Sequence, residues 1–186
     1  MKRTLYLIAG ANGSGKTTLA HELLRDGPDL ALLNADDEAA KIGDTLGIRS
    51  GRIILEKADR MLAAGRSVAL ESTIAGRYHE YMIGQFRRKK YEIILIYVFL
   101  DFPEANIARV KKRVALGGHD IPEADIRRRF YKSVKNFWPT SKLADRWKLF
   151  HNGDDNYELV AFGGAGVEQI INDELYKKFK KGLRNE

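Results

Sequence analysis

The segment GANGSGKT at residues 10–17 constrains the fold of this chain more than any other feature. Its spacing is G-x-x-x-x-G-K-[ST], with an apolar run before it at residues 4–10 and a helical pattern after it at residues 15–24. Glycines let such a loop turn successive N–H groups toward phosphate oxygens, and the positive end of the helix dipole adds to the attraction. The pattern therefore predicts a phosphate-binding loop for a nucleoside triphosphate. Its residues are Gly10, Ala11, Asn12, Gly13, Ser14, Gly15, Lys16, Thr17 and Thr18.

Lys16 and Thr17 supply the side-chain chemistry of this loop. A lysine at this position reaches the β- and γ-phosphates, and the hydroxyl of the following threonine holds Mg²⁺. A glycine-rich turn that merely joins a strand to a helix is the alternative, but it would require neither side chain. The motif therefore predicts a site for the donor nucleotide, with the metal at Thr17.

The length, hydropathy and cysteine content of the chain indicate a single domain and argue against membrane-spanning and disulfide-bonded proteins. The 186 residues fit one domain, predicted to span residues 1–186. The longest apolar run, residues 93–100, is far shorter than the roughly 20 residues that cross a bilayer. The N-terminus does not resemble a signal peptide, and the chain has no cysteine for disulfides or thiolate chemistry. We therefore expect a cytoplasmic protein with no membrane contact.

Apolar runs alternate with amphipathic helical patterns along the chain. This alternation predicts an α/β fold of the P-loop NTPase type, with a mostly parallel sheet and helices on both faces. The expected strands are residues 4–10, 29–37, 66–73, 91–101, 146–152 and 157–164, the last two as a hairpin. The expected helices are residues 15–24, 51–65, 78–89, 103–118, 123–137 and 167–183. Such sheets bind ligands beyond the carboxyl ends of their strands, and residues 117–125 are predicted to form a mobile lid.

The end of the expected strand at residues 91–101 bears on how the triphosphate is used. Motor ATPases usually end a hydrophobic strand in Asp-Glu, whereas Asp101 is followed by Phe102 and Pro103. The Asn-Lys-x-Asp element expected of a switch GTPase is absent from the sequence. A kinase that passes the phosphoryl group to a small acceptor is therefore the favoured class.

Acidic and hydroxyl side chains follow two of the expected strands. Asp36 and Asp37 come after the second strand, where a carboxylate can act as the base for an acceptor hydroxyl. Glu71 and Thr73 come after the third, and residues two apart in an extended chain face the same way. Both pairs could instead have a structural role. The aspartates could cap the N-terminus of the following helix, and Glu71 and Thr73 could form hydrogen bonds to the local backbone. The pattern predicts an acceptor site with these alternatives open.

Residues 109–135 are strongly basic, with nine lysines and arginines against three acidic residues. Two solvated helices or a site for a polyanion would both explain such a segment. Arg109 and Arg113 are four residues apart on one expected helix, so they repel each other unless an anion lies between them. The arginine run at residues 127–129 opens the next helix, where only one or two of the three side chains face the cleft. We expect an arginine-rich lid that neutralises the transferred phosphoryl group.

Four segments of the sequence carry a family resemblance. They are GANGSGKTT, NADDEAA, ESTIAG and RVKKRVALGGHDIPEADIRRRFYKSVKNF, in this order. Together they resemble the zeta toxin family and its small bacterial relatives, which are often described as UDP-N-acetylglucosamine kinases. The resemblance spans about residues 4–137, and the block from GGHDIP to IRRRF is its most specific part.

The resemblance implies a fold like that of nucleoside monophosphate kinases, with ATP and Mg²⁺ as the phosphoryl donor. By motif, Lys16 matches the phosphate-binding lysine, Thr17 the metal-binding threonine, and Asp36 the base that activates the acceptor hydroxyl. The remaining matches are Asn34, Glu71 and Thr73 at positions that hold a sugar nucleotide, and Arg113 and Arg129 at arginines that clamp the phosphates. The implied acceptor is a nucleotide sugar such as UDP-N-acetylglucosamine, and an antitoxin protein is an implied partner.

Three other functions stay open beside this small-molecule kinase. A polynucleotide 5′-hydroxyl kinase would suit the basic segment, and an antibiotic phosphotransferase would suit the fold. The third is an ATP-binding regulatory module without transfer chemistry. Against nucleic acid, Phe130 and Phe137 fall on the apolar helix face, so the segment lacks the exposed aromatic rings of a single-strand platform.

Overall fold

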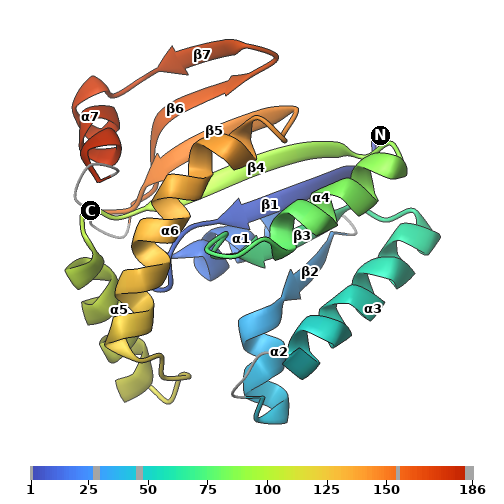
Figure 1. Ribbon diagram of the computed structural model, residues 1–186, viewed down its shortest axis with the longest axis horizontal. Helices are drawn as coiled ribbons and strands as arrows, with labels where there is room; N and C mark the ends of the chain where they lie inside the picture. The colour runs from blue at the N-terminus through green and yellow to red at the C-terminus, as the bar shows by residue number, and fades with distance from the viewer. Residues whose placement is uncertain (1, 27–29, 45–47, 154–155, 183–186) are drawn as a thin grey trace.

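A single sheet organises the part of the chain that the structure describes. This computed structural model describes residues 2–26, 30–44, 48–153 and 156–182, and the strand order is β2-β3-β1-β4-β5-β6-β7 (Figure 1). The strands are β1 Thr4–Ala9, β2 Ala31–Asn34, β3 Val68–Ser72, β4 Glu92–Phe99, β5 Arg146–His151, β6 Glu158–Gly164 and β7 Val167–Ile170. Strands β1 to β5 run parallel, β6 is antiparallel to β5, and β7 is antiparallel to β6. The prediction of a mostly parallel sheet with a hairpin formed by β5 and β6 is therefore confirmed.

The strand register brings the ends of the central strands to one edge of the sheet. Glu71 of β3 lies opposite Ile8 of β1 and opposite Asn34 of β2, and Ile8 also lies opposite Ile96 of β4. Glu71, Asn34 and Ile8 are each at or one residue before the carboxyl end of their strands, and β4 continues beyond Ile96 to Phe99. The segments that leave these strands therefore begin side by side, at the edge where such sheets bind ligands.

Helices cover both faces of the sheet, as the alternation predicts. The helices are α1 Lys16–Asp26, α2 Ala35–Ile42, α3 Ile48–Ala64, α4 Tyr78–Arg88, α5 Pro103–Ala115, α6 Glu123–Ser141 and α7 Asp173–Lys181. Leu5 and Leu7 of β1 belong to the large core that also holds side chains of α3, α4, α6 and α7, whereas Ile8 packs with Ala20 of α1 on the opposite face. Figure 1 shows α4 and α6 in front of the sheet. No helix among the described residues has the length and apolar character needed to cross a bilayer.

The second expected strand, residues 29–37, is shorter than predicted because a helix begins at Ala35. Residue 29 lies outside the described residues, and β2 ends at Asn34. The Asn34 side-chain Oδ1 accepts a hydrogen bond from the backbone N–H of Asp37 at 3.3 Å, which caps α2. Asp36 and Asp37 consequently lie in the first turn of a helix and not in a strand.

The expected helix at residues 167–183 is wrong in its first part. Val167–Ile170 form β7, which folds back on β6 through a turn at residues 165–166, both with positive φ, 50° and 82°. The helix α7 begins only at Asp173, where the Asn172 side chain caps it by accepting a backbone hydrogen bond. All four residues of β7 are exposed, so they carry no alternation between buried and exposed positions that would mark a strand.

Helices α5 and α6 enclose a small core of their own next to the main sheet. Its members are Ile107, Val110, Ile121 and Ile126. The chain between the two helices, residues 116–122, contains the exposed Leu116, while residues 123–125 already belong to α6. That residues 117–125 move as a lid stays a prediction.

Candidate active site

The glycine-rich loop lies between β1 and α1 with a backbone that requires its glycines. Gly10, Gly13 and Gly15 all have positive φ, at 141°, 80° and 98°. A Cβ at Gly10 would lie 2.1 Å from the carbonyl oxygen of Val98, and one at Gly13 would lie 2.5 Å from that of Asn106. Any side chain at these positions would force the loop away from its neighbours. The tight turn predicted from the spacing is therefore present.

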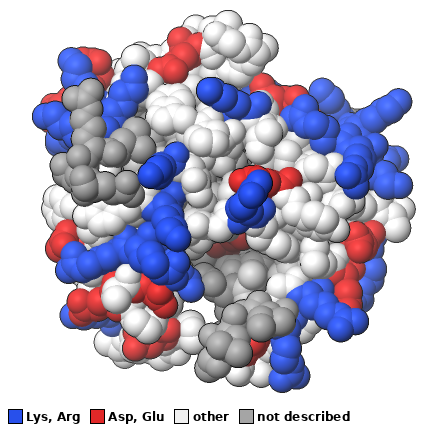
Figure 2. Space-filling model, in the orientation of Figure 1, with Lys and Arg blue, Asp and Glu red and all other residues white. Residues whose placement is uncertain are grey.

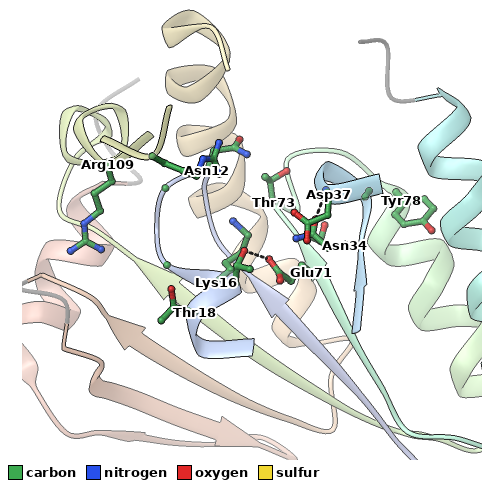
Figure 3. Close-up of a pocket in the computed structure, with 15 residues that line it drawn as sticks. Asn12, Lys16, Thr18, Asn34, Asp37, Glu71, Thr73, Tyr78 and Arg109 are labelled. Atoms are coloured by element: carbon green, nitrogen blue, oxygen red, sulfur yellow. Dashed lines mark hydrogen bonds between the residues drawn. The ribbon is translucent and has the colours of Figure 1, made fainter. Parts of the chain in front are cut away.

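Lys16 and Thr17 are the first two residues of α1, and the side chains of both make hydrogen bonds within the site. Lys16 is buried, and its Nζ donates to the Ala11 carbonyl at 2.8 Å across the loop. The Thr17 hydroxyl donates to Oε2 of the buried Glu71 at 2.9 Å (Figure 3). The carboxylate at the end of β3 therefore touches the residue predicted to hold the metal.

A cavity of about 300 Å³ opens over the loop and joins segments that are far apart in the sequence. Its lining residues are Asn12, Gly13, Gly15, Lys16, Thr17, Thr18, Asn34, Ala35, Asp37, Glu71, Ser72, Thr73, Tyr78, Arg109 and Arg113. Figure 3 shows Asn34, Asp37, Thr73 and Tyr78 on one side of Lys16, and Arg109 on the other. Most of the predicted site residues thus meet in one place, whereas Gly10, Ala11, Ser14 and Arg129 are not among the residues that line it.

The predicted base, Asp36, lies in the chain between two residues that line this cavity. Asp36 is the second residue of α2, and its side chain lies outside the described part of the structure. Its neighbours on either side, Ala35 and Asp37, both line the cavity. Asn34 lines it too, although its side chain also serves as the cap of α2. The role of Asp36 stays a prediction.

Glu71 and Thr73 both line the cavity, as residues two apart at the end of a strand should. The Thr73 hydroxyl accepts a hydrogen bond from the backbone N–H of Ala75 at 3.5 Å. The alternative role, a hydrogen bond to the local backbone, is therefore present for Thr73. Glu71 instead bonds across to Thr17 of the phosphate loop. The two side chains share the cavity but have different hydrogen-bond partners, and that both hold an acceptor stays a prediction.

The three consecutive arginines of α6 have three different partners. Arg127 pairs with Glu104 and Arg128 pairs with Asp125 at 2.8 Å, both at the surface. Arg129 turns inward, and its Nη1 donates to Oδ1 of Asn12 in the phosphate loop at 3.3 Å. Figure 2 shows such basic and acidic side chains next to one another over α5 and α6. Part of the charge in this segment is thus neutralised on the surface, and Arg129 reaches the loop.

Arg109 and Arg113 of α5 both line the cavity, with guanidinium groups held by backbone carbonyls. The Arg113 Nη2 donates to the His119 carbonyl at 2.8 Å, which ties α5 to the chain that leads into α6. The Arg109 Nη2 donates to the carbonyls of Asn152 and Gly153 at 2.8 and 2.7 Å. The sequence marked Arg109 as cationic but could not show that it contacts the segment after β5.

Several residues of the site carried no functional expectation. Tyr78 lines the cavity, and burial raises its pKa to about 12, so its hydroxyl stays neutral at ordinary pH. Asn106, Asn152 and Tyr157 contact the back of the phosphate loop. The only available signal was a polar residue inside an apolar pattern, since Asn106 shares a buried face of α5 with Ile107 and other apolar residues.

The residues near Thr17 fit a magnesium ion that arrives with a nucleotide. In the described ranges, no group of three His, Cys, Asp or Glu side chains could hold a metal by itself. Mg²⁺ bound to phosphates keeps several waters and takes only one or two protein oxygens. The Thr17 hydroxyl and the Glu71 carboxylate are oxygen ligands of this kind, 2.9 Å apart.

Asp101, which follows β4, lies apart from this site. Its Oδ1 is 3.2 Å from Nε2 of His151 at the end of β5, and it is not among the residues that line the cavity. The carboxylate that contacts the phosphate loop comes instead from β3, the neighbour of β1 on its other side.

Residues 5–131 match the family model AAA_33, which is described as an AAA domain. An uncharacterized protein of Haemophilus influenzae is 26% identical over 136 residues, which are 70% of this chain and 94% of that protein. The fold is also similar to that of known crystal structures. The complex of AvrRxo1-ORF1 and -ORF2 with ATP matches with a TM-score of 0.67 and 16% identity, over 96% of this chain and 63% of the other.

Two further solved structures share the fold. The PezAT chromosomal toxin-antitoxin system of Streptococcus pneumoniae matches with a TM-score of 0.67 and 13% identity, over 98% of this chain and 86% of the other. The Pnkp1/Rnl/Hen1 RNA repair complex matches with a TM-score of 0.63 and 20% identity, over 74% of this chain and 46% of the other. This chain therefore spans less than two thirds of the AvrRxo1 and RNA repair chains that it matches.

Proposed function

The chain belongs to the AAA domain family AAA_33, and from that premise we propose that it is an ATP-dependent phosphotransferase acting on a hydroxyl of a small acceptor. The observation that carries the proposal is the shared cavity. Lys16 and Thr17 of the phosphate loop line it together with Asn34, Asp37 and Thr73, polar residues at or just after the ends of two other strands. A donor phosphate and an acceptor hydroxyl can therefore meet in one space.

The donor half rests on the P-loop fold, which binds nucleotides, and on the similarity to a complex that contains ATP. Lys16 would move from the Ala11 carbonyl to the β- and γ-phosphates when they enter the loop. The Thr17 hydroxyl, with Glu71 behind it, would hold Mg²⁺. When bound, the metal neutralises charge on the phosphate oxygens. Arg113 and Arg129 would add positive charge around the transferred group.

The acceptor half rests on the resemblance to the zeta toxin family. A nucleotide sugar such as UDP-N-acetylglucosamine would lie against Asn34 and Thr73, whose amide and hydroxyl groups suit the hydroxyls of a sugar. The acceptor oxygen attacks the γ-phosphorus, the bond from that phosphorus to the bridging oxygen breaks, and ADP leaves. The proton of the acceptor hydroxyl passes to the carboxylate of Asp36. The fold similarity to the PezAT toxin-antitoxin system supports the expectation of an antitoxin partner.

A screen for phosphate transfer tests the proposed function. Purified protein with ATP and Mg²⁺ is offered nucleotide sugars, nucleosides and oligonucleotides with a 5′-hydroxyl, and products are identified by mass spectrometry. We expect one small acceptor to gain a single phosphate with formation of an equal amount of ADP, and Lys16→Met to give no product. ATP binding without a product from any acceptor would overturn the proposal in favour of a regulatory module.

A polynucleotide 5′-hydroxyl kinase is the second candidate, favoured by the fold similarity to an RNA repair complex. Phe130 and Phe137 are buried, however, so they offer no exposed rings for stacking bases. End-labelling of an oligonucleotide in the same screen, at a rate above that of every nucleotide sugar, would establish this alternative.

Glu71→Gln is expected to raise the Mg²⁺ concentration for half-maximal transfer about tenfold. The amide keeps the shape of the side chain but loses the charge next to Thr17, and changes behind a metal ligand typically weaken metal binding by this amount or more. Transfer is measured over a range of Mg²⁺ at saturating ATP and acceptor. Glu80→Gln, at an exposed ion pair with Arg77, is the control. An unchanged Mg²⁺ dependence with a higher KM for the acceptor would return Glu71 to the acceptor site.

A further inference from the structure

Three side chains outside the phosphate loop hold its backbone from behind. Asn106 donates through Nδ2 to the Asn12 carbonyl at 2.7 Å, and Asn152 donates through Nδ2 to the Ser14 carbonyl at 2.9 Å. The Tyr157 hydroxyl donates to the Gly15 carbonyl at 2.7 Å. We call Asn106, Asn152 and Tyr157 the loop brace. Two of its three members come from the segment after β5, outside the residues that match the family model.

The loop brace favours one orientation of the N–H groups of the loop, together with the first helical bond of α1 from the Leu19 N–H to the Gly15 carbonyl at 3.2 Å. In a trans peptide the carbonyl of one residue and the N–H of the next point in opposite directions. When the carbonyls of residues 12, 14 and 15 are turned toward the brace, the N–H groups of residues 13, 15 and 16 are turned away from it. Gly13, Gly15 and Lys16 all line the cavity. The brace therefore aims these donors at the place where phosphate oxygens bind.

The contact between the loop and its brace is close and leaves little room for adjustment. A Cβ at Gly15 would lie 2.2 Å from Nδ2 of Asn152 and 2.9 Å from the Tyr157 hydroxyl. Asn152 is itself held, because its N–H donates to the Phe99 carbonyl at 3.0 Å and its carbonyl accepts from Arg109. Burial raises the pKa of Tyr157, so its hydroxyl stays protonated and available as a donor. The brace thus connects the loop to β4, β5 and α5.

Asn106 and Asn152 lower the stability of the fold relative to apolar side chains of similar shape. Both are buried, and in the part of the chain that the structure describes the Oδ1 of Asn106 and the Oδ1 of Asn152 have no hydrogen-bond partner. A buried acceptor without a donor lowers stability, and an apolar side chain of similar shape would avoid that cost. What the amides provide is the Nδ2 donor to the loop carbonyl. This points to a role in the binding site.

We propose that Asn106, Asn152 and Tyr157 are positioning residues that set the affinity of this chain for the triphosphate of its donor nucleotide. They act through the backbone of the loop and touch no reacting atom. The inference rests on the proposed function only for nucleotide binding and does not require that phosphate is transferred. A rigid, correctly aimed loop binds ground state and transition state alike, so its loss raises KM for ATP and leaves kcat nearly unchanged.

Tyr157→Phe and the double variant Asn152→Leu with Tyr157→Phe test this inference. Binding of ATP with Mg²⁺ is measured by calorimetry, and the melting temperature is measured without nucleotide. Tyr157→Phe is expected to raise the Kd about fivefold, as for loss of one neutral hydrogen bond, and the double variant about 25-fold. Tyr81→Phe, at an exposed ring on α4, is the matched control and should bind as the wild type does. Once the acceptor is known, KM for ATP should rise with kcat within about twofold.

The result that overturns the inference is a Kd within twofold of the wild type in both variants. A Kd that rises only in proportion to a lower fraction of folded protein would also overturn it. If the double variant does not fold, Tyr157→Phe decides alone, because it removes a single oxygen atom. Weakened binding without any phosphorylated product would leave the loop brace intact and refute only the transfer. Product formation with unchanged ATP binding in both variants would refute the loop brace and support the proposed phosphate transfer.

Discussion

Asp36→Asn is expected to lower the rate of phosphate transfer about 10³-fold and to leave ATP binding at the wild-type level. Asparagine keeps the shape of the side chain but cannot take the proton of an acceptor hydroxyl, and a positioned base contributes about 10²- to 10⁴-fold. Asp36 lies in the first turn of α2, beside two residues that line the cavity. The phosphate loop is formed by another segment, so the donor site keeps its contacts.

Asp37→Asn is the matched control for this experiment. It changes the next carboxylate in the same helical turn, which is exposed and lines the cavity, and whose N–H is already bonded to Asn34. Asp37 lines the cavity but is not the assigned base, so we expect its loss of rate to stay well below the roughly 10²-fold that marks removal of a base. Single-turnover formation of phosphorylated acceptor and nucleotide binding are measured for both variants. A wild-type rate for Asp36→Asn, or a loss confined to Asp37→Asn, would refute the assignment of the base.

Arg129→Gln is expected to lower kcat about 10³-fold, the size of effect reported for arginines that neutralise a moving phosphoryl group. Of the three consecutive arginines, Arg129 is the one that contacts the phosphate loop, through Oδ1 of Asn12. Its charge would lie near the γ-phosphate when the loop is filled. The cost should therefore fall on the transition state and appear in kcat more than in nucleotide affinity.

Arg128→Gln provides the comparison for this prediction. The Arg128 guanidinium pairs with Asp125 at 2.8 Å on the surface, where solvent screening leaves such a pair little effect on stability. Its kcat should stay within about twofold of the wild type. Initial rates at saturating ATP and acceptor, together with melting temperatures, measure both effects. Equal losses in the two variants would mean that the basic helix acts only through its overall charge.

Much of the fold could be predicted because strands and helices leave periodic patterns in the sequence. The buried strand β4 and the hairpin of β5 and β6 appear close to where the apolar runs placed them. The failures were local and concerned short elements. In α2 the cap at Asn34 overrode the apparent strand, and in β7 a two-residue turn redirected an exposed segment with no burial pattern. Caps and turns act through single residues and leave no periodic signal.

Most residues that line the cavity could be named from the sequence, but their arrangement could not, and their roles stay predictions. Glu71 and Thr73 were expected to share one task, yet Glu71 bonds to Thr17 and Thr73 bonds within its own turn. The members of the loop brace carried no motif at all. An asparagine or tyrosine has no characteristic spacing, so its function becomes visible only when its partner is known.

By itself the sequence determined where the phosphate loop lies and which tight turn it makes, because the residues that this turn requires are adjacent in the chain. Glycines at three places, a lysine and a threonine specify that backbone through local sterics and chemistry. Only the tertiary structure decided what surrounds it. The bond of Asn12 to Asn106 joins residues 94 positions apart, that to Arg129 joins residues 117 apart, and that of Gly15 to Tyr157 joins residues 142 apart. Such contacts depend on strand order and helix packing, which bring distant parts of the chain to one edge of the sheet.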